Sequence, residues 1–493
     1  MSTKNHIGII GGGFAGLSAA SILAKQHNKV TLFEKNAQIG GRARQFNEAG
    51  YTFDMGPSWY WMPDVFERFY NQFGYTTSDF YELKKLEPNF KMIFSNDNYL
   101  DIPSNWEELL EMFENLEKGA GLSLKKFMDE AKFKYDKSMQ DLIYSPGESV
   151  FEFARLDIIR DSFKLQLFSS FRKHVRSHFS NPELIALMEF PILFLGAMPK
   201  DTPALYSMMN YSGLVDGTFY PMGGFGKVKE ALKKVASEQG VEFKLDKDVK
   251  KINVESNAVS GIDLGDEQYS LNGIIGASDY HHIEMKLLDK KYRNYDENYW
   301  DRKVFAPSCL LFYLGVNKKV PSIEHHNLFF DKDYELHAKE IYQDKKWPTD
   351  PLFYVCAPSK TDSSVAPEGH ENLFILVPIA PGCEDTRELR AQYYDMVMDR
   401  LESFCNFSVR DHIDFKRSYC VRDFENDYNA YKGNAYGLAN TLMQTAIFKP
   451  KLRNKRVRNL YYAGQLTVPG PGVPPSLISG EIAAKQLMKN LNF

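Results

Sequence analysis

The chain has 493 residues, which is enough for two or three subdomains around a large hydrophobic core. Its formal net charge of −4 provides no global basic field, so composition argues against a nucleic-acid partner. The cysteines are scattered without a CxxC pair, which predicts reduced thiols in an intracellular protein and argues against a disulfide frame or a metal site. They are Cys309, Cys356, Cys383, Cys405 and Cys420.

Two features argue against an exported or membrane-spanning protein. The first predicted strand starts at about His6, which leaves no room for a signal peptide. The longest uncharged stretch, residues 459–480, contains four prolines and four glycines and therefore cannot form a spanning helix. We expect a cytoplasmic protein that does not cross a membrane.

The N-terminus carries the clearest motif. Residues 7–10 are apolar and indicate a short buried strand, and Gly11, Gly13 and Gly16 lead into a helix predicted over about residues 15–26. In a dinucleotide fold these glycines permit a tight turn, close approach of the backbone to a pyrophosphate, and close packing of helix on sheet. The helix N-terminus offers free N–H groups and a positive dipole to the pyrophosphate.

A second strand is predicted at residues 30–33 and ends at Glu34, which can accept hydrogen bonds from both ribose hydroxyls. Gly40, Gly41 and Arg42 follow, and this trailing Gly-Gly-Arg indicates that the dinucleotide is FAD. Strand, glycines, helix, strand and acid in this register predict a dinucleotide-binding fold.

The rest of the chain alternates helical and strand-rich segments. Helical patterning dominates residues 86–209 and includes residues 106–113 and 163–179, and strand-rich units follow at 219–279 and 307–419. Strands are predicted at 241–245, 249–254, 274–277, 309–316, 352–357 and 373–379.

We therefore predict an α/β fold: a Rossmann-like FAD-binding domain, a discontinuous mixed-sheet substrate domain and a helical membrane-facing region. The FAD-binding domain is expected to combine residues 1–75, 215–285 and 445–493. The substrate domain is expected to combine residues 76–214 and 286–444, with the membrane-associating helices within 86–205.

Near the C-terminus, another strand ends at Gly464 and is followed by a proline- and glycine-rich turn at residues 469–476. A final helix begins there, because Leu477, Gly480, Ala484, Leu487 and Leu491 recur at helical spacing. If a flavin ring lies at its N-terminus, the helix dipole stabilises negative charge on the reduced ring. The alternative is an ordinary C-terminal helix that docks on the sheet.

Several segments resemble those of the bacterial and fungal phytoene desaturases and related carotenoid desaturases, within the FAD-dependent amine-oxidase-like superfamily. They are residues 9–44, 53–57, 220–224, 357–369, 429–437 and 464–480, and together they span nearly the whole chain. Two positions depart from the pattern. Met222 stands where a basic residue is more frequent, and Gln465 stands where relatives often carry an acid that binds the ribityl chain.

The resemblance implies a set of FAD-binding residues and no metal. It places Gly11, Gly13 and Gly16 around the pyrophosphate and Glu34 on the adenosine ribose. It also places Arg42 near the phosphates or flavin and the backbone of Val249 against the adenine. The remaining positions would lie along the ribityl chain and isoalloxazine. The complete set is Gly11, Gly13, Gly16, Glu34, Gly41, Arg42, Val249, Gly464, Gly472, Val473 and Pro474.

The resemblance also implies an enzyme that introduces C=C bonds into a C40 polyene such as phytoene, by hydride transfer to flavin, with a quinone or oxygen as the electron acceptor. The lost proton needs an acceptor or a stabilising charge. Glu152 and Arg155 are the candidates, because three-residue spacing puts both on one helix face and resembles an acid-x-x-Arg pair of related desaturases. The alternative is a surface ion pair.

A polyene substrate dissolves in lipid, so we expect the enzyme to be peripheral on the cytoplasmic membrane. Apolar residues at successive i+4 steps, flanked by basic ones, indicate an amphipathic helix that lies in the interface, and residues 190–195 could extend the contact. A core-packing helix is the alternative. The apolar positions are Phe163, Leu167, Phe171, Val175 and Phe179, and the basic ones are Lys164, Arg172, Lys173 and Arg176; Trp59, Tyr60 and Trp61 could line a tunnel mouth.

Other functions stay open at this point. A hydroxyneurosporene-type desaturase or a carotenoid isomerase is the main rival, and an amine or porphyrinogen oxidase is a more distant one. A different class is a non-catalytic lipid carrier on the same fold, such as the prenyl-binding GDP-dissociation inhibitors. Such carriers have lost flavin binding, whereas the glycines, Glu34 and Arg42 are intact here.

Overall fold

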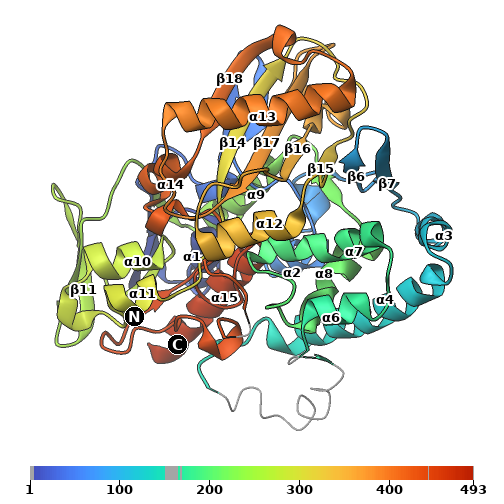
Figure 1. The fold of residues 1–493 in the computed structure, drawn as a ribbon. Coiled ribbons are helices and arrows are strands. Elements are labelled where there is room, and N and C mark those ends of the chain that lie inside the picture. Colours follow the sequence, from blue (N-terminus) through green and yellow to red (C-terminus); the bar gives the residue numbers. More distant parts are fainter. Residues whose placement is uncertain (1–4, 150–164, 167–168, 442, 492–493) are drawn as a thin grey trace.

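The computed structural model describes residues 5–149, 165–166, 169–441 and 443–491 (Figure 1). Its N-terminal motif lies in a five-stranded parallel sheet of order β19-β13-β1-β2-β9. Three distant parts of the chain supply the strands. They are β1 (His6–Ile10), β2 (Lys29–Phe33), β9 (Glu242–Lys244), β13 (Gly273–Gly276) and β19 (Leu460–Tyr462).

Different layers cover the two faces of this sheet. On one face, α1 (Phe14–Lys25) contacts both α9 (Phe225–Glu238) and α15 (Val473–Asn490). On the other face, side chains of β1, β2, β13 and β19 share a core with an antiparallel sheet and with Trp300 of α11 (Glu297–Asp301). That sheet consists of β10 (Lys251–Glu255), β11 (Ala258–Asp263) and β12 (Gln268–Ser270).

The second large sheet has seven strands in the order β18-β14-β17-β16-β15-β6-β7, and only the pair β15–β6 is parallel. Helix α13 (Arg387–Cys405) packs across one face of it through a separate apolar core, as Figure 1 shows. The strands are β6 (Phe90–Ser95), β7 (Asn98–Ile102), β14 (Ser308–Val316), β15 (His326–Phe329), β16 (Phe353–Cys356), β17 (Glu371–Ile379) and β18 (Ile413–Tyr419).

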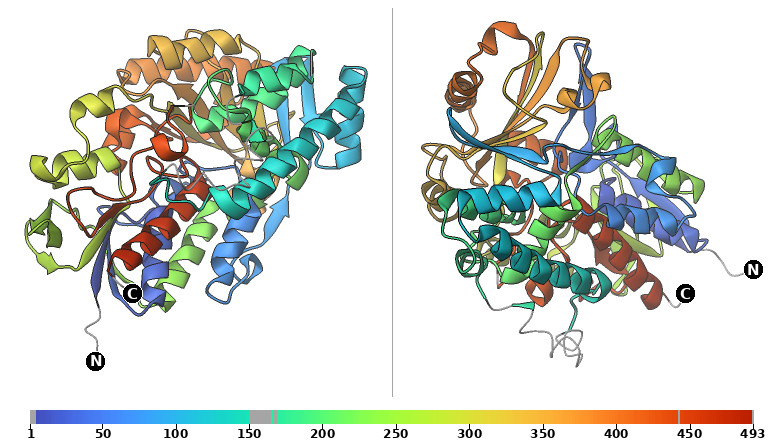
Figure 2. Two further views of the ribbon diagram at one scale, coloured as in Figure 1. Left: turned by 90° about the horizontal axis from the view of Figure 1, so that it is seen from below. Right: turned by 90° about the vertical axis from the view of Figure 1, so that its right-hand side faces the viewer.

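Short helices form a cluster beside this sheet, and Figure 2 shows it from two further sides. They are α2 (Pro63–Asn71), α3 (Trp106–Leu116), α4 (Ala120–Lys137), α6 (Phe171–Arg176), α7 (Pro182–Glu189) and the 3₁₀ turns Phe190–Leu195 and Ala204–Ser207. Two further helices, α12 (Tyr334–Lys339) and α14 (Val421–Tyr428), lie outside this cluster in the sequence. Among the helices described, none is both long and apolar enough to cross a bilayer.

The strands predicted for the middle of the chain are confirmed, and they belong to three sheets. The six strands predicted between residues 241 and 379 appear as β9, β10, β13, β14, β16 and β17, with ends within two residues of the prediction. Helix α1 is shifted by one residue. Period-two and buried-run patterns identify these strands because each has at least one face in a core.

The predicted amphipathic helix over residues 163–179 is wrong in its described part. Phe163, Lys164 and Leu167 lie outside the described residues. From residue 169 on, the helix is the short α6, and Phe171, Val175 and Phe179 are buried in the main core. The basic Arg172 pairs with Glu189 and Glu335 across neighbouring elements. Phe190 and Ile192 are buried too, so these apolar side chains have no exposed face for a membrane. The apolar spacing reflects core packing.

Candidate active site

A cavity of about 980 Å³ begins at the carboxyl edge of the parallel sheet. The segments that follow β1, β2 and β13 line it with residues 11–15, Glu34 and residues 277–279, and the segment after β19 adds residues 463–466. Because the carboxyl ends of parallel strands meet at one edge, ligands of open α/β sheets bind there. The cavity is therefore the candidate site.

The turn after β1 requires glycine. Gly11 has a φ of +106°, and a Cβ on Gly16 would lie 2.0 Å from the carbonyl oxygen of Gly11. Gly13 is the N-cap of α1 and, as a glycine, brings no side chain that could cover the free N–H groups. The helix therefore presents bare donors and its positive dipole end to the cavity, as an anionic pyrophosphate requires.

Glu34 is held in place by the same turn. Its Oε2 accepts a hydrogen bond of 2.7 Å from the Gly12 N–H, and its Oε1 accepts from the backbone N and Nδ2 of Asn36 at 2.9 and 2.8 Å. A carboxylate offers about four acceptor positions, so capacity is left for a hydroxyl group in the cavity. The side chain is buried yet lines the cavity, which fits a ribose.

Unsatisfied polar atoms surround the middle of the crevice. Arg42 Nη2 donates to the Asn434 carbonyl at 3.0 Å and the guanidinium lies 5.0 Å from the ring centre of Tyr428, but Nε has no partner among the described residues. Burial lowers the pKa of Arg42. Ser278 Oγ, also on the cavity wall, likewise finds no partner within the described chain. Buried orphan groups of this kind fit a polar, anionic ligand.

The C-terminal motif closes the crevice. Gly464 and the run Gly472, Val473 and Pro474 line the cavity, as does Val249. Helix α15 begins at Val473 with Gly472 as its N-cap, at a φ of +114°. A second helix N-terminus without a side-chain cap therefore faces the crevice, where it can stabilise negative charge. With its amide oxygen turned toward Arg42, Gln465 accepts a 3.0 Å hydrogen bond from Nη2.

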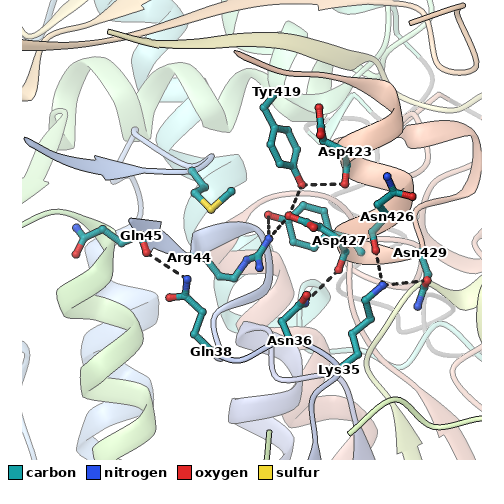
Figure 3. A network of polar contacts seen from close by, with 12 residues as sticks. Lys35, Asn36, Gln38, Arg44, Gln45, Tyr419, Asp423, Asn426, Asp427 and Asn429 are labelled. Carbon is teal, nitrogen blue, oxygen red and sulfur yellow. Dashed lines mark hydrogen bonds and ion pairs between the residues drawn. The ribbon is translucent and has the colours of Figure 1, made fainter. Parts of the chain in front are cut away.

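A polar network that the sequence did not indicate holds the loop after Glu34 against α14 (Figure 3). Arg44 pairs with Asp427, which also accepts a 2.9 Å hydrogen bond from the hydroxyl of Tyr419. Asn36 Nδ2 donates to the Asp427 carbonyl at 3.1 Å, and Lys35 donates to the Asn426 carbonyl. Apart from the Tyr419 bond, these contacts join residues almost four hundred positions apart, so no local pattern could have revealed them.

Beyond the crevice, the cavity continues between the seven-stranded sheet and the helical cluster, where its walls are mostly apolar. Trp59 and Trp61 line it, whereas the neighbouring Tyr60 is buried and bonded to Tyr81 at 2.9 Å. At residues 443–448 the lining reaches the surface, because Met443 is 70% exposed and Phe448 49%. Examples of the apolar lining are Trp61, Phe190, Leu205, Leu328, Ile341 and Leu376.

The predicted acid–arginine pair is not placed by the structure. Glu152 and Arg155 lie outside the described residues. The predicted crevice residues, in contrast, all come together: ten of them line the cavity, and Gly16 shapes the turn beneath it. Ser278 and Asp279 were missed. Their place in the sequence could have indicated them, because they follow a strand of the parallel sheet at its carboxyl edge.

Comparisons with known proteins identify the family of the chain. Residues 14–488 match the profile of the flavin containing amine oxidoreductase family. The chain is 39% identical to a carotenoid 3,4-desaturase of Haloarcula japonica, over 98% of each chain, and 29% identical to a zeta-carotene-forming phytoene desaturase of Myxococcus xanthus, over 98% and 94%. Its fold is similar to that of cyclohexylamine oxidase from Brevibacterium oxydans, with a TM-score of 0.60 at 13% identity over the whole of both chains.

The chain therefore belongs to the flavin containing amine oxidoreductase family, on the branch that holds the carotenoid desaturases, and it is an FAD-dependent oxidoreductase. The crevice fits this cofactor, since it offers glycine turns, an oriented carboxylate, unsatisfied donors and two bare helix N-termini. Bound FAD supplies an oxidised isoalloxazine that accepts a hydride. The residues of the chain itself bind and orient the substrate and exclude water from it.

Proposed function

We propose that this enzyme introduces C=C bonds into a C40 carotenoid, with FAD as the oxidant. One observation carries the proposal: a single cavity leads from the dinucleotide crevice into an apolar chamber beside the seven-stranded sheet. Such a chamber suits a hydrocarbon chain and excludes water from the cationic character that develops when a hydride leaves. In this view residues 1–75, 215–285 and 445–493 form the FAD-binding domain, and residues 76–214 and 286–444 form the substrate domain.

The eleven predicted FAD contacts enter the proposal with separate roles. Gly11, Gly13 and Gly16 would shape the pyrophosphate turn, and Glu34 would bind the adenosine ribose. Arg42, beside Gly41, would donate its unused Nε–H toward the phosphates or flavin. Val249 would contact the adenine, and Gly464, Gly472, Val473 and Pro474 would follow the ribityl chain and ring.

Two carotenoid reactions have to be distinguished by experiment, the desaturation of phytoene and desaturation at the 3,4 position. Phytoene is the substrate that the sequence motifs indicate, and a relative named for it matches at 29% identity. Desaturation at the 3,4 position is favoured by the higher identity, 39%, to the Haloarcula japonica enzyme. The two reactions differ in which carbon pair the chamber presents to the flavin.

The experiment is expression in bacterial hosts that accumulate either phytoene or lycopene, followed by chromatography of the extracted pigments. Conversion of phytoene to coloured carotenes would establish the phytoene reaction, and a red-shifted product from lycopene would establish 3,4-desaturation. If both pigments stay unchanged while the purified protein is loaded with flavin, carotenoid desaturation of these substrates is refuted. A protein that binds no flavin would instead point to a lipid carrier.

We also propose that the enzyme acts as a peripheral protein on the cytoplasmic membrane, with a quinone or oxygen as the final electron acceptor. The support is the exposure of Met443 and Phe448 where the cavity lining reaches the surface, since a lipid-dissolved substrate needs an apolar entry. Flotation with anionic liposomes tests this contact. Double replacement of Met443 and Phe448 by Ser should abolish flotation, whereas replacing the exposed Leu122 by Ser should not.

Glu152 and Arg155 remain our proposed catalytic pair, in which Glu152 is either the proton acceptor or a charge that stabilises the developing cation. Alanine replacement of Glu152 should lower turnover on the order of 10²-fold if its carboxylate takes the proton, because positioned general bases contribute that much or more. An unchanged turnover would remove Glu152 from the mechanism.

A further inference from the structure

A short chain of hydrogen bonds runs from the cavity wall into the protein. The hydroxyls of Ser58 and Tyr354, both on the cavity wall, lie 2.9 Å apart. The same Tyr354 hydroxyl lies 2.5 Å from Nδ1 of His326, which is fully buried behind the wall. Ser58 follows β4 (Tyr51–Asp54), Tyr354 lies on β16 and His326 begins β15. Three separate elements therefore build one continuous path.

The ring at the inner end of the path is held in place. The His326 ring stacks on Trp59 with centres 4.1 Å apart and planes 9° from parallel, so it cannot turn freely. Tyr354 donates to Nδ1 when the imidazole is in its Nε2–H form, and Ser58 then donates to Tyr354. His326 Nε2 has no partner among the described residues. In this form Nδ1 of His326 is the acceptor at the inner end of the path, and the hydroxyl of Ser58 is at the cavity end.

The surroundings keep the acceptor neutral. The titratable groups of the described chain that face His326 are Tyr354, the adjacent His325 and Cys356, which pairs with it across β15 and β16. Burial lowers the pKa of His326 well below its usual value and that of His325 to about 3, and it raises that of Cys356 to about 12. Because burial disfavours the charged imidazole, His326 accepts a proton only from a strong acid, and the carbocation left by hydride loss is a strong acid.

Desaturation creates the need for such a path. Removing a hydride from one carbon leaves a cation that must lose a proton from the next carbon, and hydrocarbon walls cannot accept it. Ser58 lies two residues after Gly56, where a Cβ would be 2.7 Å from the Arg42 carbonyl oxygen. Gly56 therefore packs against Arg42, and Arg42, Gly56 and Ser58 line the same cavity.

We propose that Ser58, Tyr354 and His326 form the relay that carries the substrate's proton out of the cavity, which leaves Glu152 the role of a charge that stabilises the cation. The inference rests on the proposed desaturation. The C–H bond beside the cation breaks, and its electron pair becomes the new C=C bond. The proton passes to the Ser58 oxygen as the Ser58 proton moves to Tyr354 and the Tyr354 proton moves to Nδ1 of His326. The hydride goes to the oxidised FAD, so both electrons and both hydrogens are accounted for.

The test is anaerobic single-turnover reduction of the FAD-loaded enzyme by its carotenoid, followed by flavin absorbance. We expect Tyr354→Phe and Ser58→Ala to slow reduction on the order of 10²-fold, while Ser58→Thr, which keeps the hydroxyl, retains most of the rate. FAD affinity and the spectrum of the oxidised flavin should not change. Tyr81→Phe is the matched control, because Tyr81 is a buried, hydrogen-bonded phenol away from the cavity.

Deuterated substrates separate a relay from a structural role. With the relay broken, deuterium on the carbon that loses the proton should slow reduction more than it does in the unaltered enzyme, whereas deuterium on the hydride-donating carbon should not. Rates within threefold of the unaltered enzyme, or slower rates without this selective isotope effect, would overturn the relay. If the unaltered enzyme shows no reduction with any carotenoid, the proposed function itself fails and the relay with it.

Discussion

At the scale of single residues, the crevice depends on groups whose ordinary behaviour burial has changed. Glu34 keeps both carboxylate oxygens engaged with backbone and amide donors, so its position is set before any ligand binds. The Arg42 Nε–H is buried and has no partner among the described residues, and a bound anion would satisfy it. Preorganised polar groups of this kind favour binding, because few side chains have to become ordered when the ligand binds.

Replacement of Glu34 by Gln should weaken FAD binding. The amide keeps the size of the side chain but loses the charge, and a hydrogen bond to a charged group contributes about 1.5–3 kcal/mol. We therefore expect a rise of about tenfold or more in the dissociation constant, measured by titrating flavin-free protein with FAD. Glu255→Gln removes an exposed carboxylate elsewhere in the domain and should have no effect. Equal affinities for Glu34→Gln and the unaltered protein would contradict the assignment.

The burial of Lys449 predicts that the stability of the folded protein depends on pH. Its side chain is buried, its Nζ has no partner in the described part of the chain, and burial followed by the nearby Lys303 charge lowers its pKa from 10.5 to about 7. Between about pH 7 and pH 10 the unfolded chain then binds more protons at this lysine than the folded one, so stability rises with pH across that window. Lys449→Met should abolish a rise on the order of 4 kcal/mol.

Unfolding by urea at several pH values, with FAD removed, measures this rise. Lys455→Met, which removes an exposed lysine of the same segment, should keep it. Identical pH dependence in Lys449→Met and the unaltered protein would show that folding does not lower the pKa of Lys449.

At the scale of elements, the crossing of α1 and α15 determines where both helix N-termini lie. Gly480 is in the middle of α15, and a Cβ there would be 2.1 Å from the carbonyl oxygen of Ala15 in α1. Only glycine permits the two backbones to approach this closely. Because α1 and α15 each start at the cavity, their close packing aims two positive helix ends at one crevice.

Gly480→Val should therefore damage both stability and cofactor binding. Overpacking of a close helix contact costs typically 1–3 kcal/mol, and the displaced helices would no longer present their donors together. Thermal unfolding should show a lower midpoint, and bound FAD should be lost on gel filtration. Lys489→Val places the same side chain on the exposed side of α15 and controls for helix propensity. Unchanged FAD content in Gly480→Val would disprove the link between crossing and crevice.

The contrast between residues 7–34 and 163–179 shows which elements can be predicted locally. Strand, turn and helix at the N-terminus follow from short-range sterics and periodic burial, and they were predicted to within a residue or so. The apolar spacing of Phe171, Val175 and Phe179 was equally regular, but it faces the core. Periodicity reports that a face is apolar, and it does not report whether protein or lipid covers that face.

At the scale of the whole molecule, the cavity exists because separate parts of the chain meet. The loop after Glu34 is held to α14 by Asn36, Arg44 and Asp427, although the two segments are far apart in sequence (Figure 3). The seven-stranded sheet then extends the crevice into the apolar chamber. Cofactor binding and chamber shape are thus coupled through long-range polar contacts.

Removal of Asp427 tests this coupling. Asp427→Ala leaves the buried Arg44 without its carboxylate, and breaking a buried ion pair costs about 3–5 kcal/mol at full burial and less here, because the Asp427 side chain is 32% exposed. We expect a lower thermal midpoint and weaker FAD binding together. Asp423→Ala, in the same helix but without a contact to the Glu34 loop, should leave FAD affinity unchanged. Loss of stability with unaltered FAD affinity would show that the network only supports the fold.

The dinucleotide motif could be predicted from the sequence, because turns, helix starts and strand ends depend on neighbours a few residues away. Gly11, Gly16 and Glu34 followed from that local chemistry, whereas Gly472 was placed at the crevice by the family resemblance. The tertiary structure was needed to find the apolar chamber, the ion pair between Arg44 and Asp427, and the hydrogen-bonded path from Ser58 to His326. Their partners come from remote segments, and a pairing across hundreds of residues leaves no periodic or short-range trace in one sequence.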